Sequence, residues 1–118
     1  MNRYKDLKVW QKAIQLSVDI YQITGRFPKE ERFGLVSQMN RASVSIPSNI
    51  AEGAGRNGPK DFNNFLGIAL GSCFELDTQL VISNKLNYLS DQEFEKFELE
   101  LEHIQNMIVK LKKSLNIQ

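Results

Sequence analysis

Apolar residues recur along this chain at spacings of three and four, the period of an α-helix, rather than at the spacing of two expected of a strand. The stripe is clearest after Ser90, where it runs without a break through Phe94, Phe97, Leu101, Ile104, Ile108, Leu111 and Leu115. Segments with this period are separated by short connections that contain glycine, proline or asparagine. The pattern predicts an all-α fold with four helices and no strands.

Capping signals set the expected helix boundaries. We expect the first helix to begin with Asp6 as N-cap and to end at Thr24, before Gly25. The second should open at Phe27-Pro28, bend at Pro47 and stop in the glycines of residues 53–58. Pro59 should start the third helix. Short connections then give an antiparallel up-down-up-down four-helix bundle, a single domain over residues 1–118.

The fourth helix and the acids around it have local explanations. Ser90 and Glu93 have the spacing of a capping box, followed by acids in the first half of the helix and lysines at its end. We interpret the acids between residues 91 and 102 as a solvated face, with a surface for a basic partner as the alternative.

Two helices carry signs of additional or close helix contacts. The first has one apolar stripe through Leu7, Trp10, Ile14 and Tyr21 and a second on another side, so it should be contacted on both. The third carries Gly67 and Gly71, a pair of small residues that would let another helix approach closely. The two-sided first helix predicts oligomerisation, and the glycine pair predicts close helix packing.

A polar stripe in the second helix is the most unusual feature of the sequence. The segment from Arg41 to Gly53 contains a proline, three serines and an asparagine, which are poor choices for an ordinary helix interior. At 100° per residue, one third of the circumference carries Arg41, Ser45, Ser48, Asn49, Glu52 and Arg56. Apolar residues occupy the opposite side.

Composition excludes several classes of protein. The 118 residues carry a net charge of +1, too little for a strong non-specific nucleic-acid binder. Residues 1–60 nevertheless carry +5 and residues 61–118 carry −4, an asymmetry that is typical of a basic face or of an attraction between subunits or helices. We find no signal peptide and no apolar run of about 20 residues, and so expect a cytoplasmic protein without membrane contact.

Candidate chemistry is sparse, and we expect no catalytic, cofactor or metal site. The glycines Gly53, Gly55 and Gly58 match a dinucleotide fingerprint, but the strand that this motif requires is absent; a phosphate site beside Arg56 and Lys60 is the weaker alternative. His103 is the only histidine and is best explained as solvated, and Cys73 as a small buried apolar residue. Glu75 and Asp77 project in different directions and form no pair.

The chain resembles the bacterial four-helix bundle proteins encoded in intervening sequences of 23S rRNA genes. The resemblance rests on the opening Tyr4–Ala13, the segment Val44–Gly53 and the segments Phe65–Ser72 and Glu75–Leu80 of the third helix. It implies a bundle that assembles into a homopentameric ring without enzymatic activity. The accessory subunit of diversity-generating retroelements is also similar, but it is more basic than this chain.

Two functions are therefore expected, in order. The first is a non-catalytic homo-oligomeric scaffold whose subunit interface includes Ser45, Ser48, Asn49 and Glu52. It would engage RNA or a nucleic-acid enzyme through a basic set comprising Arg41, Arg56, Lys60, Arg3 and Lys12. The alternative is a module that binds a protein or a small ligand through the polar stripe, without nucleic acid. Tight packing of the second helix within its own bundle would explain the stripe without either function.

Overall fold

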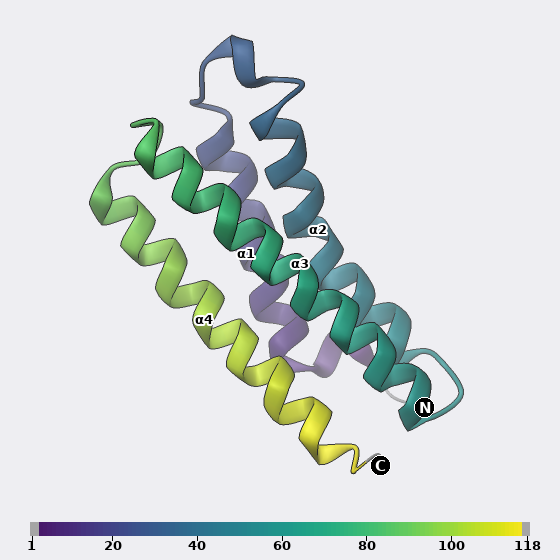
Figure 1. The fold of residues 1–118 in the computed structure, drawn as a ribbon. Helices are drawn as coiled ribbons and strands as arrows, with labels where there is room; N and C mark the ends of the chain where they lie inside the picture. The colour runs from purple at the N-terminus through teal and green to yellow at the C-terminus, as the bar shows by residue number, and fades with distance from the viewer. Residues whose placement is uncertain (1–2, 117–118) are drawn as a thin grey trace.

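The computed structural model describes residues 3–116, which form a bundle of four α-helices (Figure 1). No strand occurs among these residues, so the all-α prediction is confirmed. Two short 3₁₀ turns precede the first and second helices. The elements are η1 (Tyr4–Asp6), α1 (Lys8–Thr24), η2 (Lys29–Glu31), α2 (Leu35–Ala54), α3 (Pro59–Lys85) and α4 (Asp91–Ser114).

The helices run alternately up and down a body of 43 × 23 × 23 Å. Helix α1 packs against α2 and α4, and α3 packs against the same two neighbours. In Figure 1, α1 therefore lies behind α3, diagonally across the bundle. The starts of α1 and α3 and the ends of α2 and α4 lie at the same end of the molecule. This arrangement leaves α1 and α3 with outer faces that point in opposite directions.

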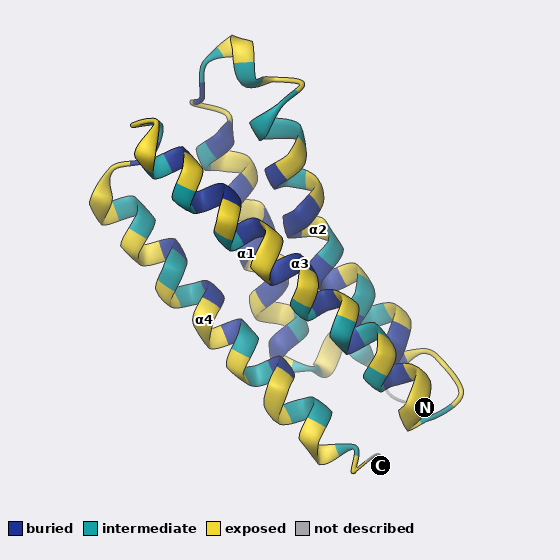
Figure 2. Ribbon diagram, in the orientation of Figure 1, coloured by how far each residue is buried: buried dark blue, intermediate teal, exposed yellow. Residues whose placement is uncertain are grey.

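The core lies between the apolar stripes of all four helices (Figure 2). The second stripe predicted for α1 is buried from Val9 to Ile20, and the stripe of α4 is buried at Phe97, Leu101, Ile104 and Ile108. Each such side chain contributes roughly 1.5–3 kcal/mol by leaving water. The side chains that are almost completely buried include Leu16, Ile20, Met39, Ile46, Ile50, Leu66, Leu76, Leu80, Leu101 and Ile104.

Two predicted helix starts are wrong. Asp6 does not cap α1: it ends the turn η1, and Leu7 occupies the N-cap position without a side-chain hydrogen bond. The segment after Phe27-Pro28 forms only the single turn η2, and α2 begins at Leu35. Gly34 interrupts the helix, with φ −108° and ψ −108°, a conformation outside the helical region. Asp6 and Pro28 are therefore residues typical of a helix start that lie in 3₁₀ turns or beside them instead.

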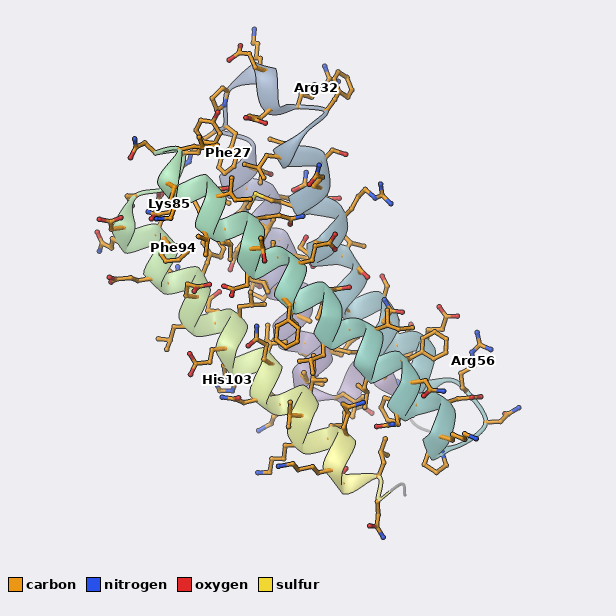
Figure 3. The ribbon with its side chains drawn as sticks, viewed as in Figure 1. Phe27, Arg32, Arg56, Lys85, Phe94 and His103 are labelled. Carbon is orange, nitrogen blue, oxygen red and sulfur yellow. The ribbon has the colours of Figure 1, made fainter. Side chains whose placement is uncertain are left out.

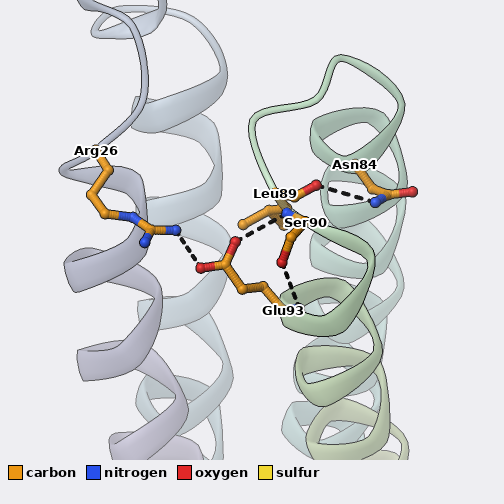
Figure 4. Close-up of polar contacts among 5 residues, drawn as sticks. All are labelled: Arg26, Asn84, Leu89, Ser90 and Glu93. Atoms are coloured by element: carbon orange, nitrogen blue, oxygen red, sulfur yellow. Dashed lines mark hydrogen bonds and ion pairs between the residues drawn. The ribbon is translucent and has the colours of Figure 1, made fainter.

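The connection between α3 and α4 follows the sequence prediction (Figure 4). The Glu93 backbone N–H donates to Ser90 Oγ at 3.1 Å, and the Ser90 backbone N–H donates to Glu93 Oε1 at 3.0 Å. The second carboxylate oxygen accepts from Arg26, at the end of α1. These hydrogen bonds, the one from the Ser90 N–H above all, hold the pKa of Glu93 below its ordinary value. The capping box therefore also ties α4 to α1.

Close contact between α2 and α3 depends on Gly53. A Cβ atom at this position would lie 2.7 Å from Phe65 Cβ and 3.0 Å from Phe62 Cδ1, closer than carbon atoms approach without a shift. Gly53 is buried, and the polar stripe precedes it on the same helix. The first of the three glycines at the end of α2 therefore serves helix packing.

Helix α3 is more apolar than the sequence analysis recognised. By length and composition it could cross a membrane, and among residues 3–116 no other helix meets that description. In the bundle it packs against α2 and α4, yet only 39% of its most apolar window is buried. A long apolar helix with most of that window uncovered presents a surface on which another molecule could pack.

Candidate interaction surfaces

Part of the polar stripe is used inside the bundle. Ser45 Oγ lies 2.8 Å from Ser72 Oγ on α3, and Asn49 Nδ2 donates to the Ser45 carbonyl and hydroxyl oxygens at 2.8 and 2.9 Å. Ser45 and Asn49 are half-buried and Ser72 is buried. This network joins α2 to α3, the structural explanation that the sequence analysis left open. Whether the same residues also contact another subunit stays a prediction.

The remaining stripe residues are exposed. Ser48 points to solvent, and Glu52 forms an ion pair with Arg56 at 2.7 Å, one helical turn away. The Arg56 guanidinium also lies 5.0 Å from the centre of the Phe65 ring, an arrangement that favours a cation. Figure 3 shows Arg56 at the end of the bundle, beside the connection from α2 to α3. Arg56 is thus held in place and still half-exposed.

Arg41 lies away from that end, beside a hollow between α2 and α3. The hollow has a volume of about 250 Å³ and is lined by Gln38, Arg41, Ala42, Ser45 and Glu75. Arg41 and Glu75 line the same hollow, yet neither forms an ion pair within residues 3–116. The arrangement offers one cation and one carboxylate to a small polar ligand.

A basic surface forms where α1 and α3 begin and α2 and α4 end. The predicted residues Arg3, Arg56 and Lys60 all belong to these segments, whereas Arg41 and Lys12 lie further along their helices. The lysines of the α4 C-terminus, which the sequence analysis attributed to the helix dipole, complete the surface. We call this the basic end: Arg3, Lys5, Lys8, Arg56, Lys60, Lys110, Lys112 and Lys113.

The basic end carries a net positive charge that the near-neutral total of the chain does not reveal. Its eight cations face only three acids in the same segments, Asp6, Glu52 and Asp61, which leaves +5 in a chain whose total is +1. Arg3 pairs with Asp6 at 3.7 Å, and Lys112 Nζ donates to the Asn63 carbonyl and side-chain oxygens at 3.0 Å. The other lysines form no ion pair within residues 3–116.

Two apolar patches lie on opposite sides of the bundle. The α1–α2 patch consists of Ile14, Val18, Tyr21 and Val44, and its largest member, Tyr21, is 52% exposed. The α3 patch consists of Ile68, Phe74, Ile82 and Leu86, and Phe74 is 54% exposed. Since α1 and α3 are diagonal in the bundle, the two patches face away from each other. Of the first apolar stripe of α1, Leu7 and Trp10 pack against the core and Ile14 and Tyr21 are exposed, so a contact on that outer side stays a prediction.

The two glycines of α3 do not serve packing within the chain in the way expected. A Cβ atom on Gly71 would meet nothing within 4 Å, and one on Gly67 would meet only the Lys112 ammonium at 3.5 Å. A mid-helix glycine costs about 1 kcal/mol against alanine. Within residues 3–116 nothing occupies the space beside Gly71, which lies between Ile68 and Phe74 of the α3 patch.

One pair of carboxyl groups escaped the sequence analysis because its members are far apart in the chain. Asp77 on α3 does not pair with Glu75, as expected, but it lies beside Glu98 on α4. Partial burial, followed by the hydrogen bond and charge of Asp77 and the charge of Glu102, raises the pKa of Glu98 to about 7. Only the bundle topology could have indicated this pair.

Metal and thiol chemistry find little support in the described residues. No group of three His, Cys, Asp or Glu side chains among residues 3–116 is placed to hold a metal ion. His103 is exposed on α4, as expected (Figure 3). Cys73 is fully buried, and burial raises the pKa of its thiol to about 12, so it carries almost no thiolate at neutral pH.

The fold and its surfaces define a small antiparallel four-helix bundle with one basic end and two uncovered apolar patches. A family model, "23S rRNA-intervening sequence protein", matches residues 5–110, and the chain belongs to this family. A crystal structure from Bacteroides thetaiotaomicron, described as a protein of unknown function from the S23 ribosomal protein family, has the same fold. It is 24% identical, with a TM-score of 0.80 over 89% of this chain and 98% of that one. No curated protein matches the sequence.

Proposed function

We propose that this protein is a non-catalytic, cytoplasmic scaffold that assembles with copies of itself and holds RNA on its basic end. The assembly we propose is a closed ring, with five copies as the resemblance to the ring-forming bundles implies. The observation that carries the proposal is the pair of uncovered apolar patches on opposite sides of one bundle. A contact between two different patches propagates from copy to copy and closes when the rotation permits.

Three features of the two patches support a head-to-tail contact. Each patch combines several large apolar side chains, as expected of an interface core. The first half of the chain carries +5 and supplies the α1–α2 patch, while the second half carries −4 and supplies the α3 patch. Gly71 leaves open space in the α3 patch, where the backbone of a neighbouring helix could approach.

Complementing variants test this assembly. Val18→Lys should spoil the α1–α2 patch and Phe74→Lys the α3 patch, so each variant alone should sediment as a monomer. A mixture should form a one-to-one dimer, because each variant retains one intact patch that fits the intact patch of the other. Phe33→Lys, an exposed residue outside both patches, is the control. A mixture that stays monomeric, or single variants that still assemble, would contradict the head-to-tail contact.

The RNA-binding part of the proposal is supported by the basic end. Exposed lysines and arginines from α4, the α2–α3 connection and the start of the chain gather there with few acids among them. Lysine and arginine neutralise backbone phosphates, and arginine also donates a planar pair of hydrogen bonds. A ring of parallel bundles would place every basic end on one side and multiply the weak attraction of a single copy.

A titration with single-stranded RNA at two salt concentrations tests the binding. If all five net charges contact phosphates, affinity should fall about a hundredfold between 50 and 200 mM salt. Lys60→Glu combined with Lys113→Glu should weaken binding and flatten this dependence. Lys85→Glu combined with Lys96→Glu, the same charge change at the opposite end, is the matched control. Equal RNA affinity of the two double variants, or an affinity that does not change with salt concentration, would contradict RNA binding at the basic end.

The hollow beside Arg41 favours a second candidate function, a module that binds a small polar ligand or a partner protein. Its two opposite charges lack ion-pair partners within residues 3–116 and lie on separate helices. Arg41→Gln and Glu75→Gln should then abolish binding of a zwitterionic solute while sedimentation stays unchanged. Loss of assembly in both variants would assign these residues to the subunit interface instead.

A further inference from the structure

The seam between α1 and α4 is open along most of its length. Three hollows follow one another there, with volumes of about 370, 300 and 290 Å³, and each is lined by residues of both helices. The first lies at the basic end and the third near Arg26, at the end of α1. This seam belongs to neither of the apolar patches, so the inference goes beyond the proposed function.

The floor of the seam is apolar and its rims are polar. Val9, Leu16 and Ile104 form parts of the floor and are almost completely buried, whereas Lys12, Gln15 and Glu100 stand on the rims. Leu99 adds an apolar wall to the middle hollow and is 71% exposed. An apolar floor between polar rims is the form of a groove that receives the apolar face of a helix.

The spacing of the hollows is that of a heptad. One floor residue of α1 lies in each hollow, at Val9, Leu16 and Ile23, and these three residues are spaced by seven. Seven residues of a helix rise about 10.5 Å, so a helix laid along the seam meets a new hollow every second turn. Apolar side chains at every seventh position of that helix would each enter one hollow, as in a coiled coil.

We propose that the α1–α4 seam binds an amphipathic helix of a partner protein, with large apolar residues at every seventh position and acidic residues at one end. The charges on the rims of the seam determine the direction in which the partner helix lies. Lys8 and Lys110 line the first hollow with no acid among its lining residues, whereas Lys12 shares the middle hollow with Glu100. At the other end, the third hollow has two cations, Arg26 and Lys96, and two acids, Asp19 and Glu93, and Glu93 pairs with Arg26. The acidic end of the partner helix therefore lies over Lys8 and Lys110, at the basic end.

A second copy of this chain fits the seam less well. The outward face of α3 is the uncovered apolar helical face with the right length, and its positions spaced by seven are Ile68, Glu75 and Ile82. Glu75 would enter the middle hollow and bring a carboxylate onto Leu16, at the cost of its desolvation. The seam therefore matches a helix of different sequence.

Peptide probes test the seam. The first is a labelled peptide of about 18 residues with leucine at every seventh position, further leucines on the same face and glutamates at one end. The second has the same composition with the leucines distributed around the helix. We expect the first peptide to bind in a fluorescence anisotropy titration and the second to bind at least about tenfold more weakly.

Two variants of the full chain test whether the peptide binds in the seam. Leu99→Lys in the wall of the middle hollow should weaken binding of the first peptide about tenfold or more. Phe33→Lys, at an exposed apolar residue that lines none of the three hollows, should leave that binding unchanged. Equal binding of both peptides, or wild-type affinity in Leu99→Lys, would overturn the proposal. So would peptide binding that appears only when the oligomer dissociates, because a second copy would then occupy the seam.

The proposal and the proposed function fail separately. Sedimentation of the same samples reports assembly, and the RNA titration reports the basic end, whereas the peptides report the seam alone. A monomeric protein that still discriminates between the two peptides would contradict the scaffold and support the seam.

Discussion

The hydroxyl of Ser17 on α1 donates a hydrogen bond of 2.7 Å to the backbone carbonyl of Ser43 on α2. Ser43 lies four residues before Pro47, so this is the carbonyl that the proline, which has no N–H, leaves without its helical partner. Both serines are buried. The proline in the polar stripe is therefore tolerated because a neighbouring helix supplies the missing donor.

Replacing Ser17 by alanine removes that hydrogen-bond donor and should destabilise the fold. Ser17→Ala leaves a buried carbonyl unsatisfied, and we expect the free energy of unfolding to fall by about 1–3 kcal/mol, measured by chemical denaturation. In a Pro47→Ala background the alanine N–H can bond to Ser43, so the same change should cost much less. If the two substitutions are additive in this cycle, Ser17 and Pro47 are not coupled in the way described.

Alanine substitutions at Gly53 of α2 and at Gly71 of α3 should change the stability of the subunit in opposite directions. Gly53→Ala forces a Cβ against Phe65 and Phe62, so the free energy of unfolding should fall by roughly 1–3 kcal/mol. Gly71→Ala meets open space within the chain and should raise the stability of the dissociated subunit by about 1 kcal/mol. Thermal melts of the two variants in dilute solution provide the comparison. A stabilised Gly53→Ala would mean that α2 and α3 are not in close contact.

Substitutions at two neighbouring residues of the polar stripe should distinguish its role in packing α2 against α3 from a role in contacts with other subunits. Asn49→Ala removes two hydrogen bonds at a half-buried site, and we expect a loss of about 1 kcal/mol in the stability of the subunit. Ser48→Ala changes only an exposed hydroxyl and should leave the stability of the subunit unchanged. Denaturation at low concentration measures the first effect, and sedimentation of both variants shows whether Ser48 matters to assembly. Equal stability of the two variants would contradict the internal role of Asn49.

Glu98 should make stability depend on pH in the direction opposite to that of an ordinary ion-paired carboxylate. Its pKa is raised from an ordinary value near 4.5 to about 7, so the folded chain binds the proton more tightly than the unfolded chain. This contribution is complete below about pH 4.5 and is lost as the pH rises through 7. Because the site is half-exposed and screened by solvent, the change should be about 1 kcal/mol.

Glu98→Gln tests this assignment, because glutamine stays neutral at every pH. The variant should lose the decline between pH 4.5 and 7 and should be more stable than the original chain at pH 8, in denaturation series at several pH values. Asp77→Asn should also flatten the decline, because it removes the charge that faces Glu98. Parallel stability curves for Glu98→Gln and the unchanged chain would refute the raised pKa.

The sequence predicted those features of the fold that depend on local chemistry. The stripe of α4, the Ser90–Glu93 capping box and Pro59 at the start of α3 each follow from short-range patterns, and each is confirmed. The starts of α1 and α2 were placed wrongly because Asp6 and Pro28 are typical of helix starts. The backbone instead forms a short 3₁₀ turn in both places, and it breaks at Gly34 before α2 begins.

Features that join distant residues were beyond the sequence. The sequence predicted a bend at Pro47, but it gave no sign that Ser17, on another helix, donates to the carbonyl that the proline leaves free. The basic end likewise needed the topology, which brings the lysines of the α4 C-terminus beside Arg56 and Lys60. Composition had indicated an uneven charge, but only the fold places that charge at one end of the molecule.

Assembly is the central claim, and sedimentation velocity of the unmodified protein over a wide concentration range tests it most directly. The account predicts a single species several times heavier than the 13.6 kDa chain, converted to monomer by Val18→Lys or Phe74→Lys and to a dimer when those two variants are mixed. A monomer of 13.6 kDa at tens of micromolar would contradict it.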